Sequence, residues 1–190
     1  ILMNQTHSNN FKFVDSLKKT RGKKINSDAL ITNLKGICLG VLTADCAPVL
    51  IYDKNIKMIS VIHAGWKGAL GGIIKEVIFY FKKKGSNFRN ITAVIGPCIS
   101  KKNYEVKEDF VSKFIKKDKK NRKFFSKKNY KTYFSLNSYI KHEIIRLGIK
   151  NIEIINRDTY NSKNNFFSAR KSIKNKVNDY DSNISVIMIN

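Results

Sequence analysis

Three short segments of the chain contain most of the side chains that could carry chemistry. They span residues 4–8 (Asn-Gln-Thr-His-Ser), 42–48 (Leu-Thr-Ala-Asp-Cys-Ala-Pro) and 62–68 (Ile-His-Ala-Gly-Trp-Lys-Gly). Together they hold the only tryptophan and two of the three histidines. Cysteine and histidine are ligands of zinc, and the same pair can act as nucleophile and general base. Metal binding and nucleophilic catalysis are therefore the two chemistries that these segments suggest.

A predicted β-hairpin brings Cys46 and His63 together. Two apolar runs, at 49–52 and 56–62, flank the turn residues Asp-Lys-Asn at 53–55, a pattern typical of a hairpin. The outer ends of two antiparallel strands lie side by side, and Cys46 and His63 fall at those ends. We therefore expect the two side chains to be neighbours, as joint metal ligands or as nucleophile and base.

The sequence leaves the roles of the three histidines and of Cys46 open. His7 lies 39 residues before Cys46 and is a candidate third ligand. The alternative is that Cys46 is a small core residue and His63 an ordinary hydrogen-bonded histidine. For His142 we expect a surface position on a helix, without a role.

The segment from His63 to Gly68 is a glycine-containing turn that leads into a helix. Exposed N–H groups at the start of a helix attract anions, and Lys67 adds positive charge. A phosphate is one expected occupant of this turn, and an ordinary strand-to-helix connection is the alternative.

The elements that must position these segments follow from hydrophobic periodicity. Besides the hairpin, strands are predicted at 28–33, 37–43, 91–96, 151–155 and 184–189. Helices are predicted at 69–83, 107–117 and 136–147. The basic stretch 116–131 is expected to be an exposed loop. Strands and helices are mixed without regular alternation, which favours an α+β fold in a single domain.

Composition narrows the class of protein. The chain has 190 residues, of which 42% are hydrophobic, enough for one ordinary domain with its own core. Its three cysteines are widely spaced and do not form a disulfide framework, so the expected location is cytoplasmic. We find no signal peptide and no apolar stretch near the roughly 20 residues that a membrane span needs, so no membrane partner is expected.

The formal net charge of +23 raises the question of nucleic-acid binding. However, 31 of the 37 cationic residues are lysines, whereas recognition of base edges favours arginine. Asn and Ile are enriched together with Lys, which indicates a compositional bias spread over the whole surface. We therefore expect a solvated basic surface and no specific nucleic-acid partner.

Six ordered blocks resemble the core signature of one family, the laccase-domain or multicopper polyphenol-oxidase-like family, whose members act as purine nucleoside phosphorylases. In chain order they are residues 27–32 (Ser-Asp-Ala-Leu-Ile-Thr), 43–48, 63–68, 95–99 (Ile-Gly-Pro-Cys-Ile), 104–106 (Tyr-Glu-Val) and 166–171 (Phe-Phe-Ser-Ala-Arg-Lys). The blocks cover most of the chain, and their order makes the resemblance specific.

The resemblance implies a zinc site with His7, Cys46 and His63 as ligands. Three protein ligands leave an open position, as in catalytic zinc sites. The implied activity is phosphorolysis of adenosine, inosine and S-methyl-5'-thioadenosine together with deamination of adenosine, with no organic cofactor. The implied fold is α+β, with mixed, sandwich-like β-sheets and flanking helices. Because the family usually has a further N-terminal segment, we expect residues 1–190 to form a single domain that lacks it.

Roles for individual residues follow from this hypothesis, with a purine nucleoside and phosphate as the partners. Asp45, next to Cys46, is the first candidate for carrying a proton, and a structural role similar to that of a helix N-cap is the alternative. Candidates for contacting substrate or phosphate are Gln5, Arg21, Lys67, Tyr104 and Arg170.

The chain departs from the family pattern in several places. Ser8 stands where the family usually has glycine after the histidine, and a late Gly-Arg pair has no clear match near residues 180–183. Two further departures concern chemically important positions. Lys67 replaces a frequent arginine, which keeps the charge and loses the planar fork. Asp158 stands where the family often has cysteine, so this part of the site is expected to differ.

Three other functions use the same residues or the same charge. A cysteine hydrolase would use Cys46 as nucleophile and His63 as base, and only metal analysis separates it from zinc chemistry. A multicopper oxidase needs roughly ten His and Cys ligands, judged from copper coordination preferences. Three histidines and three cysteines cannot supply them. A non-enzymatic basic nucleic-acid-binding domain would use residues 116–131.

Overall fold

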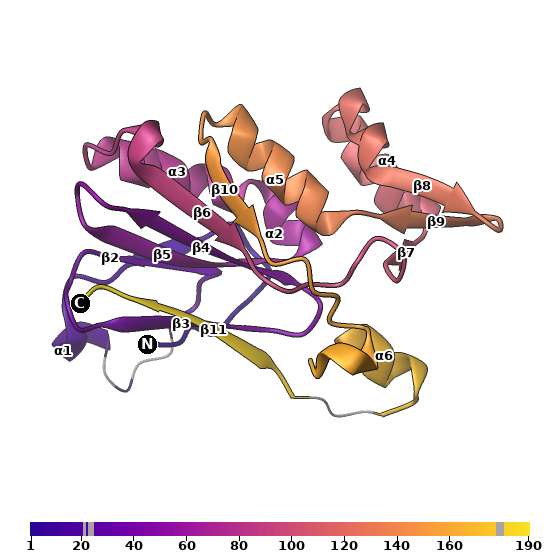
Figure 1. Cartoon of the computed structure of the whole chain (residues 1–190), viewed down its shortest axis with the longest axis horizontal. Helices are drawn as coiled ribbons and strands as arrows, with labels where there is room; N and C mark the ends of the chain where they lie inside the picture. The colour runs from indigo at the N-terminus through magenta and orange to yellow at the C-terminus, as the bar shows by residue number, and fades with distance from the viewer. Residues whose placement is uncertain (21, 23–24, 178–180) are drawn as a thin grey trace.

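A mixed six-stranded sheet forms the centre of the molecule (Figure 1). The structure, a computed structural model, describes residues 1–20, 22, 25–177 and 181–190. In spatial order its strands are β1 (Phe11–Phe13), β2 (Ala29–Thr32), β5 (Met58–Ala64), β4 (Ala47–Asp53), β6 (Ile91–Ile95) and β10 (Asn151–Ile154). The four inner strands pair with one another in antiparallel fashion, while the edge strands β1 and β10 are parallel to β2 and β6, respectively. The predicted hairpin is therefore the β4–β5 pair in the middle of this sheet.

The two faces of this sheet bury two separate hydrophobic clusters. Ala29 and Ile31 of β2 face one cluster, while Leu30 faces the other, as expected for a strand with a period of two. Strand β5 is buried at every residue, which matches its largely apolar sequence.

A second, two-stranded sheet of β3 (Cys38–Thr43) and β11 (Asn183–Met188) covers one face of the central sheet. Leu39 and Val41 of β3 pack with Val61 of β5 in the cluster between the two sheets. The predicted sandwich-like arrangement of mixed sheets is thus confirmed.

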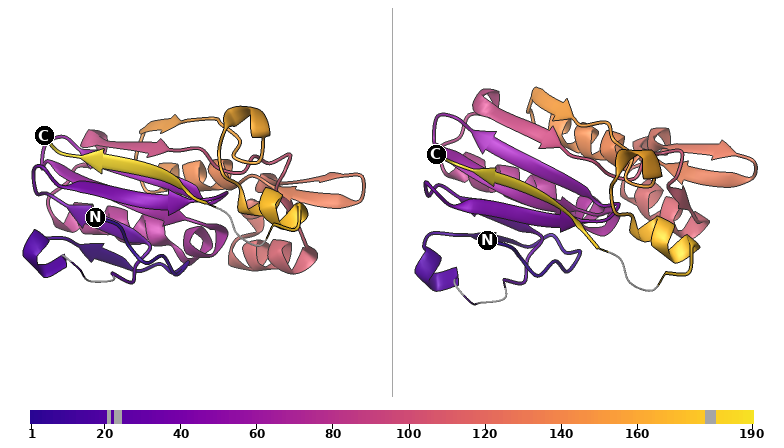
Figure 2. Two further views of the ribbon diagram at one scale, coloured as in Figure 1. Left: turned by 90° about the horizontal axis from the view of Figure 1, so that it is seen from below. Right: turned by 60° about the horizontal axis from the view of Figure 1, so that its bottom comes forward.

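Helices cover the opposite face of the central sheet (Figures 1 and 2). They include α2 (Trp66–Gly71), α3 (Ile73–Lys83) and α5 (Leu136–Arg146). The predicted single helix at 69–83 was wrong in two respects: the helical segment begins earlier, at Trp66, and it is broken at Gly72, whose φ of 93° ends α2 and starts α3. Glycine adopts this left-handed backbone without the steric penalty of a side chain.

The basic stretch 116–131 is not the exposed loop that the sequence predicted. Its residues fall at the end of α4 (Glu108–Lys117), in the 3-10 helix η2 (Lys119–Phe124) and in a hairpin of β8 (Phe125–Lys128) and β9 (Lys131–Phe134), which also pairs with β7 (Glu105–Val106). Phe124 and Phe134 are buried and anchor this unit beside Phe114 of α4. The high density of lysines led to the prediction of a loop, although the buried phenylalanines order this segment.

The remaining short elements connect or flank the two sheets. They are α1 (Leu17–Thr20), η1 (Phe88–Asn90), η3 (Ser162–Asn164) and α6 (Ala169–Lys174). The other predicted strands and helices are all present within one or two residues of their expected ends, and the α+β fold class is confirmed. Among the described residues, no helix is both long and apolar enough to cross a bilayer.

Candidate metal centre and substrate cavity

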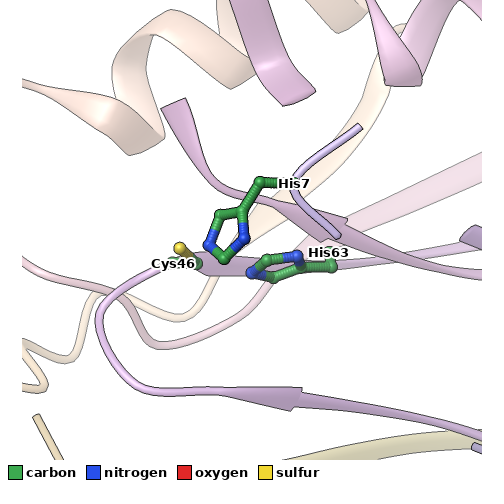
Figure 3. A group of neighbouring side chains, drawn as sticks. All are labelled: His7, Cys46 and His63. Carbon is green, nitrogen blue, oxygen red and sulfur yellow. The ribbon is translucent and has the colours of Figure 1, made fainter. Parts of the chain in front are cut away.

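The β4–β5 hairpin places Cys46 and His63 side by side, as predicted. In this pair Pro48 lies opposite His63, and Cys46 precedes the first residue of β4. The N-terminal segment brings His7 to the same point, and the donor atoms of the three side chains lie within 4.8 Å of one another (Figure 3). The rings of His7 and His63 meet edge to face, with centroids 4.7 Å apart.

The buried carboxylate of Asp28, at the start of β2, holds both histidines. Its Oδ1 lies 2.8 Å from Nδ1 of His63 and accepts a 2.9 Å hydrogen bond from the backbone N–H of His7. Its Oδ2 accepts from the backbone N–H and the hydroxyl of Ser8, each at 2.7 Å. Holding Nδ1 of a histidine in this way leaves Nε2 to face the centre, a common arrangement behind metal ligands.

The hydrogen bonds at Asp28 determine its ionisation. Burial alone would raise the pKa of Asp28, but the bonds from His63, Ser8 and His7 outweigh burial and lower the pKa to about 2. The carboxylate is therefore negative at neutral pH. Asp28 lies in one of the six family blocks, and no role for it was predicted from the sequence. Its position directly before a strand that is buried at every residue is the feature that could have indicated a buried, hydrogen-bonded carboxylate.

Two glycines allow the three segments to approach this closely. A Cβ on Gly65 would lie 2.8 Å from Sγ of Cys46 and 3.2 Å from the ring of His7. A Cβ on Gly68 would lie 2.8 Å from the backbone oxygen of Ser8. Close packing against Ser8 therefore explains the glycine at position 68. This supports the interpretation of the turn before the six-residue helix α2 as an ordinary strand-to-helix connection and not as a phosphate site.

The three donors, two imidazoles and one thiol, are of a kind that can hold a metal ion such as zinc. Burial raises the pKa of Cys46 to about 12, and the charges of Asp45 and Asp28 add to this effect. Burial likewise lowers the pKa of His63, although its hydrogen bond to Asp28 opposes this effect. A neutral imidazole beside a protonated thiol lacks the cation that a thiolate needs. A metal ion held by His7, Cys46 and His63 would supply that cation, and two imidazoles with one thiolate are ligands that zinc takes.

A small cavity of about 150 Å³ lies beside Cys46. Its polar lining comes from Asp45, Tyr104 and Arg170, and its apolar lining is Ala44, Ile99, Leu136, Ala169 and Ile173. A second cavity of about 290 Å³ shares Tyr104 and Arg170 with the first and extends to Trp66 and Phe110. These two shared residues therefore stand between the cavities.

Arg170 is held in place at this boundary. Its guanidinium Nη1 donates a 3.0 Å hydrogen bond to the backbone oxygen of Glu105, and its Cζ lies 5.5 Å from the centre of the Tyr104 ring. Burial raises the pKa of Tyr104, so its phenol stays protonated. A fixed cation beside a protonated phenol can bind an anionic or hydroxylated ligand.

Asp45 joins the loop before β4 to the C-terminal part of the chain. Its Oδ1 accepts a 2.7 Å hydrogen bond from the hydroxyl of Thr159, and its Oδ2 accepts a 2.6 Å bond from the backbone N–H of Arg170. Its φ of 85° is in the left-handed region, which is uncommon for a residue with a side chain. The contact between Thr159 and Asp45 could not be predicted from the sequence, because the two residues lie 114 positions apart.

Other predicted contact residues are placed differently. The side-chain amide of Gln5 is paired with the backbone of Leu42, donating at 2.6 Å and accepting at 2.9 Å. Lys67 is exposed and lies 5.8 Å from the centre of the Trp66 ring. Arg21 lies outside the described residues. Half-buried His142 of α5 contacts Phe124, away from the three ligands.

Asp158, one of the departures from the family pattern, organises the loop that carries Tyr104. Its carboxylate accepts hydrogen bonds from the backbone N–H and the hydroxyl of Ser100, from the side chain of Asn103 and from the backbone N–H of Tyr160. Burial would raise the pKa of Asp158, but these bonds outweigh burial and lower it.

Replacing Asp158 by asparagine is expected to lower the free energy of unfolding by about 2 kcal/mol at pH 7, because an NH₂ group would then face these donors. The folded-state pKa lies below the ordinary value of 3.8, so this stabilisation is present above pH 3.8 and lost as the pH falls through the folded pKa. Urea unfolding at several pH values measures both the loss of stability at pH 7 and its dependence on pH. Asp109→Asn, at an exposed ion pair with Lys113, should change stability by less than about 0.5 kcal/mol. A pH-independent difference for Asp158→Asn would contradict this account.

Comparison with known proteins identifies the family of the chain. A family model described as multi-copper polyphenol oxidoreductase laccase matches residues 1–190. A purine nucleoside phosphorylase of Rickettsia prowazekii is 34% identical over 191 residues, which cover 100% of this chain and 78% of that protein. An adenosine deaminase from an unknown prokaryotic organism is 35% identical over 61% of this chain and 47% of its own length.

A solved structure shows the same fold. The hypothetical protein YfiH of Bacillus licheniformis superposes with a TM-score of 0.90 at 26% identity, covering 100% of this chain and 74% of that one. Full coverage by the family model and by this structure extends the six-block resemblance to the whole chain. The chain therefore belongs to the laccase-domain family, described as multi-copper polyphenol oxidoreductase laccase, which includes relatives named purine nucleoside phosphorylase.

Proposed function

We propose that the chain is a zinc-dependent purine nucleoside phosphorylase that acts on adenosine, inosine and S-methyl-5'-thioadenosine and also deaminates adenosine. One observation carries the proposal: the donor atoms of His7, Cys46 and His63 lie within 4.8 Å of one another, beside a cavity that Tyr104 and Arg170 line. The names of the Rickettsia relative and of the prokaryotic adenosine deaminase support the substrate class.

Three protein ligands would leave a fourth coordination position of zinc open for water or substrate. Zinc, when bound by them, supplies Lewis acidity that makes water nucleophilic near neutral pH. The chain's own contribution is to hold the ligands ready: Asp28 fixes the ring of His63 and the backbone of His7, and Gly65 keeps the space between the segments open. Asp45 acts as a positioning residue in this proposal, because its two oxygens tie the cysteine loop to Thr159 and Arg170.

Phosphorolysis needs an anion site next to the nucleoside. A phosphate oxygen forms a bond to C1' of the ribose while the bond from C1' to N9 breaks, and the purine leaves with the electron pair and takes up a proton. The products are a free purine and ribose 1-phosphate. Arg170, fixed by the Glu105 carbonyl and the Tyr104 ring, supplies the positive charge for phosphate on the cavity wall.

The cysteine-hydrolase alternative is disfavoured by the same side chains. A nucleophilic cysteine is activated by a lowered pKa or by an adjacent charged base. Here burial raises the pKa of Cys46 to about 12 and lowers the pKa of His63.

Product analysis tests the proposal directly. Purified protein, with its metal content measured, is incubated with adenosine with and without inorganic phosphate, and the products are separated by chromatography. Adenine with ribose 1-phosphate is expected only when phosphate is present, and inosine is expected without it. If the metal-loaded protein forms neither set of products, the proposed function is wrong.

A further inference from the structure

The unit from Glu108 to Phe134, here called the helix–hairpin unit, concentrates positive charge. Its elements α4, β8 and β9 project from one end of the molecule (Figures 1 and 2). Residues 116–131 carry nine cationic side chains and one acidic one, about a third of the formal net charge of +23 in 16 residues. A compositional bias spread over the surface does not produce this concentration.

Most of these cations are not neutralised locally. Asp118, the acidic residue in 116–131, lies 3.7 Å from Arg146 of α5. Lys131 pairs with Glu105 at 2.9 Å. Within the described part of the chain, no carboxylate lies within ion-pair distance of Arg122 or Lys127. Free, exposed cations on a projecting element favour an anionic partner.

The unit also encloses a cavity of about 490 Å³ that shares no residue with the two cavities near Cys46. Arg122 and Lys127 line it, and Phe125 supplies an aromatic wall. The rest of the lining is Glu108, Val111, Ser112, Ile115, Ser126 and Thr132. The volume lies in the range of small-ligand sites, and the lining combines apolar surface with two cations and hydroxyl groups.

An exposed aromatic ring stands at the tip of the hairpin. Tyr130 has a relative exposure of 109% and is the exposed large apolar residue of the helix–hairpin unit. Asn129 and Tyr130 have φ values of 48° and 60°, so the two-residue turn presents the ring to solvent beside Lys128. The ring packs against no other described aromatic side chain.

We propose that the helix–hairpin unit binds single-stranded nucleic acid, an interaction beyond the proposed enzymatic activity. One base occupies the cavity against Phe125, while Arg122 and Lys127 bind the adjoining phosphates and Glu108 accepts from sugar hydroxyl or base amino groups. Tyr130 stacks on a further base, and Lys128 binds the next phosphate. Stacking surfaces next to backbone-binding cations are how proteins hold single strands without reading their sequence.

The observations favour a strand over two other anionic partners. A single nucleotide would leave the lysines outside the cavity without a counter-charge. An acidic membrane surface would suit the lysines, but membrane-inserting elements carry several exposed apolar residues, and this unit has Tyr130 alone in that class.

Fluorescence anisotropy of the full chain with a labelled oligothymidylate of about 15 nucleotides tests the proposal. The test variant is Arg122→Glu with Lys127→Glu, and the control is Lys35→Glu with Lys54→Glu. The control makes the same change in net charge at exposed positions in the turns that follow β2 and β4, outside the helix–hairpin unit. We expect the test variant to bind at least tenfold more weakly. Its slope of log K against log salt should be shallower by about 1.4, since about 0.7 is lost per phosphate contact on single strands.

Further measurements distinguish binding by the helix–hairpin unit from non-specific attraction to the positive charge of the whole chain. Tyr130→Asn keeps the turn, since asparagine tolerates a positive φ, and should weaken binding about fivefold or more through lost stacking. Turnover of adenosine should be unchanged in the helix–hairpin variants. Equal losses in the test and control variants would overturn the proposal. So would binding of adenosine monophosphate as tight as that of the oligomer, or binding only to vesicles that contain acidic phospholipid.

Discussion

Replacing Cys46 by alanine is expected to abolish stoichiometric zinc binding and to lower kcat/KM for adenosine by about a thousandfold or more, equivalent to about 4 kcal/mol. The substitution removes the anionic ligand of the set, and two imidazoles alone hold zinc weakly. The fold should be retained, because Cys46 lies in a loop at the edge of β4 and the sheet register starts one residue later.

Two further cysteines provide matched controls for this result. Cys38 is exposed on β3, and Cys98 is buried near the site but lies outside the ligand group. Cys38→Ala and Cys98→Ala should both retain one zinc per chain. Metal content is measured by atomic emission and folding by circular dichroism.

The same variant separates zinc chemistry from a nucleophilic cysteine. Unchanged metal content in purified Cys46→Ala would sink the proposed centre. Loss of turnover with full zinc retention would instead indicate a covalent role for the thiol. Restoration of wild-type activity by zinc after chelation, with no recovery in the variant, is the expected pattern.

Much of the fold could be predicted because it depends on short-range patterns. The two apolar runs on either side of residues 53–55 predicted the β4–β5 hairpin, and antiparallel pairing then required Cys46 and His63 to meet. The first half of the metal site was therefore accessible without any resemblance. His7 reaches the same place through contacts with Asp28, 21 residues away, and periodicity carries no information about such a contact.

Two errors in the predicted elements have different physical causes. The apolar stripe of α3 continues across Gly72, so periodicity alone did not reveal that the backbone turns there. In the stretch 116–131 the many lysines masked Phe124 and Phe125, which pack against α4 and α5.

The carboxylates that hold the site together were the hardest residues to assign. Asp28, Asp45 and Asp158 each accept hydrogen bonds from residues at least 20 positions away, in separate segments of the chain. Their partners are backbone N–H groups as well as side chains, and backbone groups leave no mark in the sequence. Only the assembled fold distinguishes such a carboxylate from a proton carrier or a surface charge.

Replacing Asp28 by asparagine is expected to weaken zinc binding about 10- to 100-fold, because outer carboxylates orient the ligands they contact. Asparagine has one acceptor oxygen, so its NH₂ group would face either the His63 ring and the His7 backbone or the donors of Ser8. The ligands would remain in the chain, but they would no longer be held in the binding arrangement. Competition with a chromogenic chelator measures the affinity without relying on activity.

Asp53 offers a matched control for a merely structural carboxylate. It is buried, its side chain accepts hydrogen bonds from Ser86 and from the backbone N–H of Asn55, and it lies at the turn end of the same hairpin. Asp53→Asn should lower the free energy of unfolding, as Asp28→Asn does, and leave the zinc affinity of the folded protein unchanged.

The comparison of these two variants decides what Asp28 does. Both replace a buried carboxyl group that accepts several hydrogen bonds, so a loss of stability common to both says nothing about the metal centre. Only the difference in zinc affinity does, because Asp28 contacts His63 and His7 whereas Asp53 contacts neither. If the two variants bind zinc equally well, Asp28 serves the fold alone. In that case the closeness of His7 and His63 is maintained by packing around Gly65 and Gly68.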